Sequence, residues 1–359
     1  MTIEKVFIIV PSAVMDSPVK GAAALANALV RRIPVTFVTL KAGQVGFGLL
    51  DDEVERVSLS EVGSWLSRLR TLRRMLADEG GRELVASISF CLSADFFNSW
   101  CRDVALTCSS VRGNLPKVYP GTYGRLGKWL AFRHLNRLRK IDHVVSMTHS
   151  MSELVERQTG KESPIIGNFV DELPLEKFRR KSSSKGTYHF VYTGSLIHVK
   201  QPALLIKAIG ELSDRGVQVK LDIIGRGSLL EILKEKALAL NNPKLVRFYG
   251  FVVEPFKYVA QADVLVLPSL SEGVSRSALE ALYLGVPCVM RDVDGNSELI
   301  KEGVNGFLFR EENDLPDMML RAAMLSRSSE LFRKVLTTEE FRQHTAVERY
   351  LKLLNLQDY

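Results

Sequence analysis

The stretch ADVLVLPSLSEGVSRSALEALYLGVPCVMRDVDGN, residues 262–296, decides the fold. It begins with the apolar, β-branched run Val264–Leu267, which predicts a buried parallel strand. Apolar residues then recur at helical spacing over 275–284, and Gly285 ends the helix. A second apolar run, 286–290, predicts the next strand. The loop of such a strand–loop–helix–strand unit lies at the carboxyl edge of a parallel sheet, where open α/β sheets bind ligands.

This loop and helix carry two glutamates, Glu272 and Glu280, separated by seven residues. Gly273 lets the backbone approach a ligand closely, and free N–H groups at the start of the helix form an anion site. Those N–H groups belong to Val274, Ser275 and Arg276. Two carboxylates beside such amides suit a nucleotide sugar, whose hydroxyls flank a diphosphate. Taken alone, two glutamates at this spacing favour a capped surface helix with solvated side chains, so the rest of the chain decides.

Both halves of the 359-residue chain alternate strand-like and helix-like segments, and the length suggests two domains. The pattern predicts doubly wound parallel sheets, hence an α/β fold. In the first half, strands are predicted at 6–11, 35–40, 54–59, 84–90, 104–108, 143–147 and 164–166, and helices at 21–31, 64–77, 123–139 and 151–158. In the second half, strands are predicted at 188–193, 219–224, 245–249, 264–267, 287–290 and 306–309, and helices at 202–214, 229–240, 254–260, 275–284 and 315–325.

The polar, serine-rich segment 179–186 predicts the linker between the domains. We therefore expect an N-terminal domain over residues 1–170 and a C-terminal domain over 186–337. A last helix, predicted at 338–354, follows a polar turn.

Composition points to a cytoplasmic protein. The hydrophobic fraction of 46% is ordinary, and no apolar run approaches the length of a membrane-spanning helix. The N-terminal run 6–10 is too short for a signal sequence, and Glu4 precedes it. The four cysteines lie in apolar surroundings without metal-type pairing, so we expect reduced core thiols and no metal site. They are Cys91, Cys101, Cys108 and Cys288.

The net charge of +7 is concentrated in two segments. Residues 104–141 hold eight Lys or Arg and no Asp or Glu, and residues 65–76 place four arginines among apolar positions. Both predict basic amphipathic helices, which favour an anionic membrane surface, here the inner face of the cell membrane. For either helix, a basic face that is simply solvated is as good an interpretation as membrane contact. Trp129 and Phe132 lie on the apolar side of the second helix and would suit either a core or a membrane surface. No nucleic-acid-binding motif is present, so no nucleic-acid partner is expected.

Two loops of the first half are candidate site segments. Lys20 and Gly21 follow the first strand and are expected on the acceptor side of the site, although no GxGxxG motif accompanies them. Arg112 follows a later strand end, where it would contact a phosphate or sugar, or serve as a structural loop arginine.

Two loops of the second half complete the candidate site. Gly194 and Ser195 follow the strand at 188–193, and Lys200 then precedes a helix, where it is placed to pair with a diphosphate. Arg226 lies in the glycine turn that follows the next strand, near where a nucleotide would bind.

With these residues assembled, the chain resembles the retaining glycosyltransferases of the GT-B fold, the group named glycosyltransferase family four. The resemblance covers almost the whole second half through ordered fragments, and the first half more loosely through IIGNFVD at 165–171. Glu272 and Glu280 match the family's E-x7-E motif. The fragments of the second half are TGSLIHVKQPALLIKAI (193–209), LDIIGRGSL (221–229), VRFYGFV (246–252), the opening stretch and GVNGFLF (303–309).

The resemblance implies two Rossmann-like domains facing a central cleft, an acceptor-binding N-terminal domain and a donor-binding C-terminal domain, with the last helix crossing back to the former. It implies that Glu280 binds the ribose, Glu272 the transferred sugar and Lys200 the leaving diphosphate, while Phe251 and its neighbours frame the base. The other donor contacts would come from Gly194, Ser195, Arg226 and residues 273–276. Such enzymes use no metal and no cofactor, because lysine and helix dipoles stabilise the charge.

Two departures from the family pattern stand out. Ser195 occupies a position where the family has arginine, so Arg112, Arg226 or Arg276 would have to supply the second cation. No histidine lies near Arg112, where many members carry one. Retaining enzymes of this group are thought to react on the front face, with the leaving phosphate taking the acceptor's proton, which tolerates that loss.

The expected function is transfer of a sugar from a nucleotide diphosphate, with UDP expected, to a lipid-linked or glycan acceptor in bacterial cell-surface polysaccharide biosynthesis. Two alternatives stay open. One is a soluble sugar-phosphate transferase or an epimerase on the same scaffold. The other is a non-catalytic nucleotide-sugar-binding scaffold, which only the serine at 195 and the missing histidine support.

Overall fold

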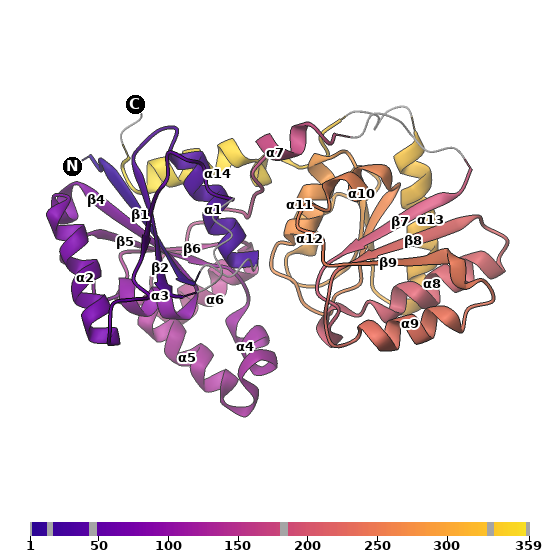
Figure 1. Cartoon of the computed structure of the whole chain (residues 1–359), viewed down its shortest axis with the longest axis horizontal. Coiled ribbons are helices and arrows are strands. Elements are labelled where there is room, and N and C mark those ends of the chain that lie inside the picture. Colours follow the sequence, from indigo (N-terminus) through magenta and orange to yellow (C-terminus); the bar gives the residue numbers. More distant parts are fainter. Residues whose placement is uncertain (1, 13–16, 43–48, 180–185, 329–333, 357–359) are drawn as a thin grey trace. The chain divides into compact units, whose positions relative to one another are not determined.

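The computed structural model describes residues 2–12, 17–42, 49–179, 186–328 and 334–356 (Figure 1). It divides into two compact units: unit 1 comprises residues 1–171 and 339–359, and unit 2 comprises residues 172–338. The predicted linker at 179–186 lies largely outside the described residues, since 180–185 are not among them.

Unit 1 contains six strands and the helices between them. The strands are β1 (Lys5–Ser12), β2 (Val35–Lys41), β3 (Glu55–Ser58), β4 (Val85–Phe90), β5 (Leu106–Val111) and β6 (His143–Ser146). The helices are α1 (Ser17–Leu29), α2 (Trp65–Asp78), α3 (Cys91–Asn98), α4 (Leu115–Tyr123), α5 (Gly127–Leu138), α6 (His149–Thr159) and α14 (Gln343–Leu353). Short 3₁₀ turns are η2 (Gly81–Glu83), η3 (Gly124–Leu126) and η7 (Glu339–Phe341).

Unit 2 repeats this architecture. Its strands are β7 (Tyr188–Thr193), β8 (Val219–Ile224), β9 (Val246–Gly250), β10 (Val264–Leu267), β11 (Cys288–Arg291) and β12 (Gly306–Phe309). Its helices are α7 (Leu173–Glu176), α8 (Ala203–Asp214), α9 (Leu230–Leu238), α10 (Phe256–Gln261), α11 (Arg276–Tyr283), α12 (Asn296–Leu299) and α13 (Leu315–Arg327). Short 3₁₀ turns are η4 (His198–Lys200), η5 (Pro243–Leu245) and η6 (Glu312–Asp314).

The two sheets share one topology. Their strand orders are β3-β2-β1-β4-β5-β6 and β12-β11-β10-β7-β8-β9, and the strand pairs are parallel. Counted from the first strand of each unit, both follow the doubly wound order 3-2-1-4-5-6. The predicted α/β class with two such sheets is confirmed. The strand order reverses between β1 and β4 in unit 1 and between β7 and β10 in unit 2, and such switch points are where doubly wound sheets bind ligands.

Alternate residues of β1 divide the core of unit 1 between the two faces of its sheet. Val6, Ile8 and Val10 pack with α1 and α14, whereas Phe7 and Ile9 pack with α2 and α3. The C-terminal helix α14 therefore completes the core of unit 1, although unit 2 separates it from the other elements in sequence.

In unit 2, the helices pack in two groups. α8 contacts α13, and α10 contacts α11, so helices cover the sheet as a doubly wound fold requires. The strands β10 and β11 at the centre of the core are buried throughout, as Val264–Leu267 shows, whereas β9 is largely half-buried.

The predicted helix at 123–139 is wrong as a single element. Gly124 adopts a left-handed φ of 58° and ends α4, and α5 begins only at Gly127. A Cβ at Gly127 would lie 2.4 Å from the carbonyl oxygen of Tyr119, so the two helices pack too closely there for any larger residue. Figure 1 shows α4 and α5 as a hairpin that extends away from the sheet of unit 1.

Three other predictions for the first half also need correction. The strand predicted at 104–108 is β5 at 106–111, because Ser109 and Ser110 are buried within it. The strand predicted at 164–166 is only an isolated bridge between Ser146 and Ile165. Helix α3 had not been predicted, because it buries polar Asp95 and Asn98 and so lacks a simple apolar period.

Candidate active site

The loops that follow the strands of unit 2 gather at the carboxyl edge of its sheet. β7 and β10 are neighbours at the switch point, so the loop from Gly194 to Lys200 lies beside the loop from Pro268 to Gly273. A backbone hydrogen bond from the Leu270 amide to the Val199 carbonyl, at 2.8 Å, joins the two loops directly.

This contact brings together two residues that lie far apart in sequence. Lys200 Nζ is 2.7 Å from Glu272 Oε1, and Ser269 Oγ donates to the same oxygen, also at 2.7 Å. The Glu272 side chain is only 9% exposed and that of Lys200 is 26% exposed, so the pair is largely shielded from water. A largely buried carboxylate held by a cation and a hydroxyl has a fixed orientation.

Asp294 also holds the loop that carries Glu272, through two hydrogen bonds. Its Oδ2 accepts from Ser271 Oγ at 2.7 Å and from the Glu272 amide at 3.2 Å. Asp294 has a φ of 47°, in the left-handed region that residues other than glycine rarely adopt. This backbone conformation places the carboxylate of the β11–α12 turn against the Glu272 loop.

Helix α11 presents the second glutamate of the motif. Ser275 precedes the helix with an extended backbone, and Arg276 opens it. Arg276 Nη2 lies 3.9 Å from Glu280 Oε1, one helical turn further on. The side chain of Val274 is buried, so only its backbone is suited to contact a ligand. The first turn of α11 thus combines amide groups, a cation and a carboxylate.

Two glycine-containing loops, which follow β7 and β8, also lie at this carboxyl edge of the sheet. Gly225 has a φ of 153°, and a Cβ there would lie 1.8 Å from the carbonyl oxygen of Gly194, so the loops after β7 and β8 touch through their backbones. Beyond them the Arg226 guanidinium lies over the Phe251 ring, 4.7 Å from its centroid. Ser195 is exposed beside Gly194, and its carbonyl accepts from Tyr192 Oη at 2.8 Å.

Arg112 belongs to unit 1, where it follows β5. Its Nη2 donates to Asn168 Oδ1 at 2.5 Å, and its Nη1 lies 3.5 Å from Ser110 Oγ. A Cβ at Gly21 would lie 2.0 Å from Arg112 Nη2, so the glycine makes room for the guanidinium. The structure thus brings Gly21 and Arg112 together. Lys20, the residue before Gly21 on α1, is half-buried.

Comparison with known proteins identifies the second unit. The family model described as "Glycosyl transferases group 1" matches residues 175–323, which contain the whole site at the edge of the second sheet. Residues 175–323 belong to the glycosyl transferases group 1 family. The predicted family is thereby confirmed, and with it the glycosyltransferase class of this unit.

Curated relatives of this glycosyltransferase unit match the chain over part of their length. The putative glycosyltransferase EpsD of Bacillus subtilis is 28% identical over 167 residues, covering 46% of this chain and 44% of the relative. The O-antigen biosynthesis glycosyltransferase WbnH of Escherichia coli is 35% identical over 149 residues, covering 42% of this chain and 40% of the relative. The chain thus spans less than half the length of these relatives.

Solved structures share the fold over nearly the full length. HepE of Anabaena, in complex with UDP and glucose, has a TM-score of 0.77 and 16% identity, and the match covers 98% of this chain and 99% of HepE. A further HepE structure contains UDP-glucose. At this identity the similarity establishes the GT-B fold of the chain and nothing further.

In the basic helix α2, two of the four arginines bind neighbouring segments of unit 1. In α2, Arg68 donates to the carbonyls of Val62 and Ser60, and Arg73 pairs with Asp103 at 2.6 Å. These two arginines therefore hold neighbouring segments of unit 1. Among the described residues, no helix combines the length and apolar character needed to cross a membrane.

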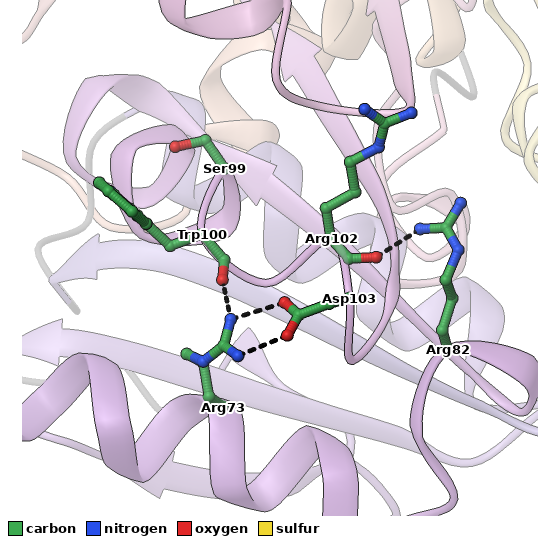
Figure 2. Close-up of a pocket in the computed structure, with 6 residues that line it drawn as sticks. All are labelled: Arg73, Arg82, Ser99, Trp100, Arg102 and Asp103. Carbon is green, nitrogen blue, oxygen red and sulfur yellow. Dashed lines mark hydrogen bonds and ion pairs between the residues drawn. The ribbon is translucent and has the colours of Figure 1, made fainter.

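A pocket of about 570 Å³ lies in unit 1 (Figure 2). Its residues come from α2, η2 and the turn between α3 and β5, which lie at the amino ends of the strands. Arg73 pairs with Asp103 and also donates to the Trp100 carbonyl, while Arg82 donates to the Arg102 carbonyl, as Figure 2 shows. The arginines that line this pocket hold neighbouring chain segments together, and this structural role accounts for their presence there.

Several residues that support the site were missed from the sequence. Ser269, Ser271 and Asp294 are short polar residues in turns, a class too common to single out. The signal for Asp294 was the turn Asp-Val-Asp-Gly-Asn at the end of the opening stretch, where an acidic residue precedes glycine. Asn168, the partner of Arg112, lies in the IIGNFVD segment that the resemblance had already marked.

Proposed function

We propose that the protein transfers a sugar, with retention of configuration, from a nucleotide-diphosphate sugar to a lipid-linked or glycan acceptor in bacterial cell-surface polysaccharide biosynthesis. The observation that carries this proposal is the Lys200–Glu272 pair, held at 2.7 Å at the switch point, with Glu280 on the helix that follows. A cation and two carboxylates suit a diphosphate flanked by two sets of sugar hydroxyls. UDP and UDP-glucose bound to HepE favour a UDP-sugar as the donor.

The proposed reaction takes place on one face of the donor sugar. The bond from the anomeric carbon to the diphosphate oxygen breaks, and its electron pair stays on that oxygen. Lys200 stabilises the negative charge that develops there. The acceptor hydroxyl oxygen bonds the same face of the anomeric carbon, and its proton passes to the leaving phosphate. Glu272 and the first amides of α11 orient the transferred sugar, so no metal ion is required.

The remaining candidate residues take supporting roles. Glu280 binds the ribose hydroxyls, and Phe251 with Arg226 lines the base side of the nucleotide. Arg276, in the first turn of α11, supplies the second cation for the diphosphate in place of the family arginine that Ser195 replaces. Lys20 and Gly21 belong to the acceptor side, and Arg112 acts in catalysis by contact with a phosphate or sugar.

Thermal stabilisation by nucleotide sugars tests the proposal. The purified chain is heated with UDP-, GDP-, ADP- and dTDP-sugars, each with and without EDTA. A ligand that binds only the folded state raises the melting temperature. We expect a selective rise with a UDP-sugar that EDTA does not change, followed by UDP release when a lipid-linked acceptor is added. A rise without turnover on any acceptor favours a non-catalytic scaffold, and no rise with any donor contradicts the proposal.

A further inference from the structure

All three tryptophans of the chain are exposed, and all three belong to unit 1. Trp65, Trp100 and Trp129 expose 51%, 45% and 53% of their surface. Burial of an aromatic side chain is a large source of stabilisation, so one exposed tryptophan is unremarkable but three on one unit need an explanation. Leu66, Leu126 and Phe132, each next to or near a tryptophan, are exposed as well.

Side-chain contacts join Trp65 and Trp100 to Arg137 of α5, the helix that also carries Trp129 and Phe132. Trp65 of α2 packs edge-on against Phe96 of α3, with centroids 5.9 Å apart. Arg137 of α5 lies 4.6 Å from the Phe96 centroid and 5.4 Å from that of Trp100. We call this the tryptophan surface, formed by Trp65, Leu66, Phe96, Trp100, Leu126, Trp129 and Phe132 with the cations Arg125, Lys128, Arg133, Arg137 and Lys140.

Cations interleave with the aromatic rings over this surface. Arg133 lies 4.8 Å from the Trp129 centroid, and Lys140 lies 5.5 Å from that of Trp100. The segment 104–141, which contains α5, has eight Lys or Arg and no acidic residue. The flanking acids Asp103 and Asp142 are neutralised by ion pairs to arginines, at 2.6 Å and 2.7 Å (Figure 2 shows the first). The surface is therefore aromatic and positively charged.

We infer that the tryptophan surface docks unit 1 on a lipid bilayer that contains anionic lipids. Tryptophan favours the interfacial layer of a bilayer, where its ring is buried and its N–H remains hydrated. Arginine and lysine beside it attract anionic headgroups. A solvated basic face explains the cations but leaves the cluster of exposed tryptophans unexplained. A polyanion such as RNA would use the cations without burying Leu126 or Phe132.

The structure also assigns the lipid-facing cations to the α4–α5 hairpin. Arg68 and Arg73 of α2 are engaged within the fold, whereas Arg125, Lys128 and Arg133 flank the exposed apolar residues of the α4–α5 hairpin. The inference rests on the proposed function only in that a lipid-linked acceptor would be presented at such a bilayer. Its test measures lipid binding without catalysis, so the membrane inference and the proposed sugar transfer can each be contradicted independently of the other.

Intrinsic fluorescence reports this surface directly, because all three tryptophans of the chain lie on it. The full chain is mixed with vesicles of phosphatidylcholine alone or with added phosphatidylglycerol, and binding is measured by flotation. We expect binding to the anionic vesicles and an emission maximum shifted to shorter wavelength, because the rings leave water. Added salt should weaken the binding. No binding to anionic vesicles, or binding without an emission shift, overturns the inference.

Two variants separate the apolar and the charged contributions. Trp129→Ser with Phe132→Ser should weaken vesicle binding at least tenfold and reduce the emission shift, since only Trp65 and Trp100 then report on binding. Replacing Arg125, Lys128 and Arg133 with Gln should weaken binding on the order of a hundredfold, since each cation near an anionic surface contributes about fivefold. Unchanged binding by both variants contradicts the inference.

Matched controls come from unit 2. Ile232 and Leu238 are exposed apolar residues of α9, and their replacement with Ser should leave vesicle binding unchanged. Circular dichroism of every variant excludes unfolding as the cause of a loss. Heparin replaces the vesicles in a parallel titration. Heparin binding that shifts the emission as far as vesicles do would contradict insertion of the tryptophans into a bilayer.

Discussion

Lys200 and Glu280 contact different parts of the proposed nucleotide, so their substitution should have different signatures. Lys200 Nζ is bound to Glu272 Oε1, and a diphosphate would compete for the same ammonium group. We expect Lys200→Met to weaken UDP binding by roughly 10- to 100-fold, because a charge-assisted contact is lost, and to leave uridine binding unchanged. Calorimetric titration with UDP and with uridine measures both. An equal loss for the two ligands would contradict the assignment of Lys200 to the diphosphate.

Glu280 should show the complementary pattern. If it binds the ribose, Glu280→Ala removes a contact that uridine and UDP share, so both affinities should fall by a similar factor of roughly 10- to 100-fold. Glu231→Ala on α9 is the matched control, since Glu231 is an exposed helix glutamate of the same unit whose carboxylate pairs with nearby Lys234 at 2.9 Å. Unchanged nucleotide affinity of Glu280→Ala would refute its role.

Asp294 provides a test of how the Glu272 loop is held. Asp294→Gly removes the acceptor for Ser271 and the Glu272 amide but suits the left-handed φ of 47°. We expect kcat to fall by about 10- to 100-fold, because Glu272 loses its fixed position, with little change in KM for the donor. Asp294→Asn keeps an acceptor and tolerates this backbone conformation, so it should retain most of the activity. Equal kcat values for Asp294→Gly and the parent would show that the turn does not position Glu272.

At the scale of the elements, Asp142 ties the start of β6 to two neighbouring segments. Its carboxylate pairs with Arg82 at 2.7 Å and with Arg102 at 2.6 Å, and it accepts from Thr107 Oγ1 at 2.9 Å. Burial alone would raise the pKa of Asp142, but the hydrogen bonds from Arg82, Thr107 and Arg102 outweigh burial and lower this pKa well below its ordinary value. The ionised form is therefore stabilised by folding.

Linkage then gives a sign for the pH dependence. A carboxyl whose pKa is lowered in the folded state adds stability above its unfolded pKa of about 4, and this stability is lost as the pH falls toward the folded value. We expect Asp142→Asn to lower the free energy of unfolding by roughly 2 kcal/mol at neutral pH and by less below about pH 4. Urea unfolding across this range measures it. Asp78→Asn, at an exposed pair, should cost less than about 0.5 kcal/mol, and a cost for Asp142→Asn that does not shrink in acid would contradict the argument.

The elements show which parts of the fold the sequence predicts. The central strands β10 and β11 of unit 2 are continuous buried runs, so their bounds were predicted nearly to the residue, as for Val264–Leu267. Helix α3 was missed because Asp95 and Asn98 face the interior, where they bind Ser89, Ser109, Ser87 and His134. The spacing of apolar residues cannot predict a helix whose buried face contains polar residues with polar partners. The break at Gly124 was missed because glycine's φ depends on packing between α4 and α5.

The same limit applies to the site. Glu272, Glu280 and Lys200 could be singled out because they lie at strand ends and helix starts, positions that the periodicity predicts. The pairing of Lys200 with Glu272 depends on β7 and β10 being neighbours, which is a property of strand order. Contacts such as Ser271 with Asp294, or Arg112 with Asn168, join segments whose approach no local pattern encodes.

At the scale of the whole molecule, the chain leaves unit 1 at residue 171 and returns to it at residue 339. The returning helix α14 packs against α1, and Tyr350 is 2% exposed within the same core as Leu25 and Ile8. The last segment is thus part of the hydrophobic core of the first unit. A change in α14 should therefore act on unit 1, even though unit 2 precedes it in the sequence.

Tyr350→Ala tests this connection. Removal of a buried aromatic ring should lower the free energy of unfolding of unit 1 by about 3–5 kcal/mol, because the cavity cannot refill. Tyr350→Phe keeps the ring and should cost much less. Hydrogen exchange should show the loss of protection in β1 and α1, while β10 and α11 keep theirs and UDP affinity is unchanged. Weaker protection of β10 in Tyr350→Ala would mean that the stability of unit 2 depends on the core of unit 1, which the division of contacts does not predict.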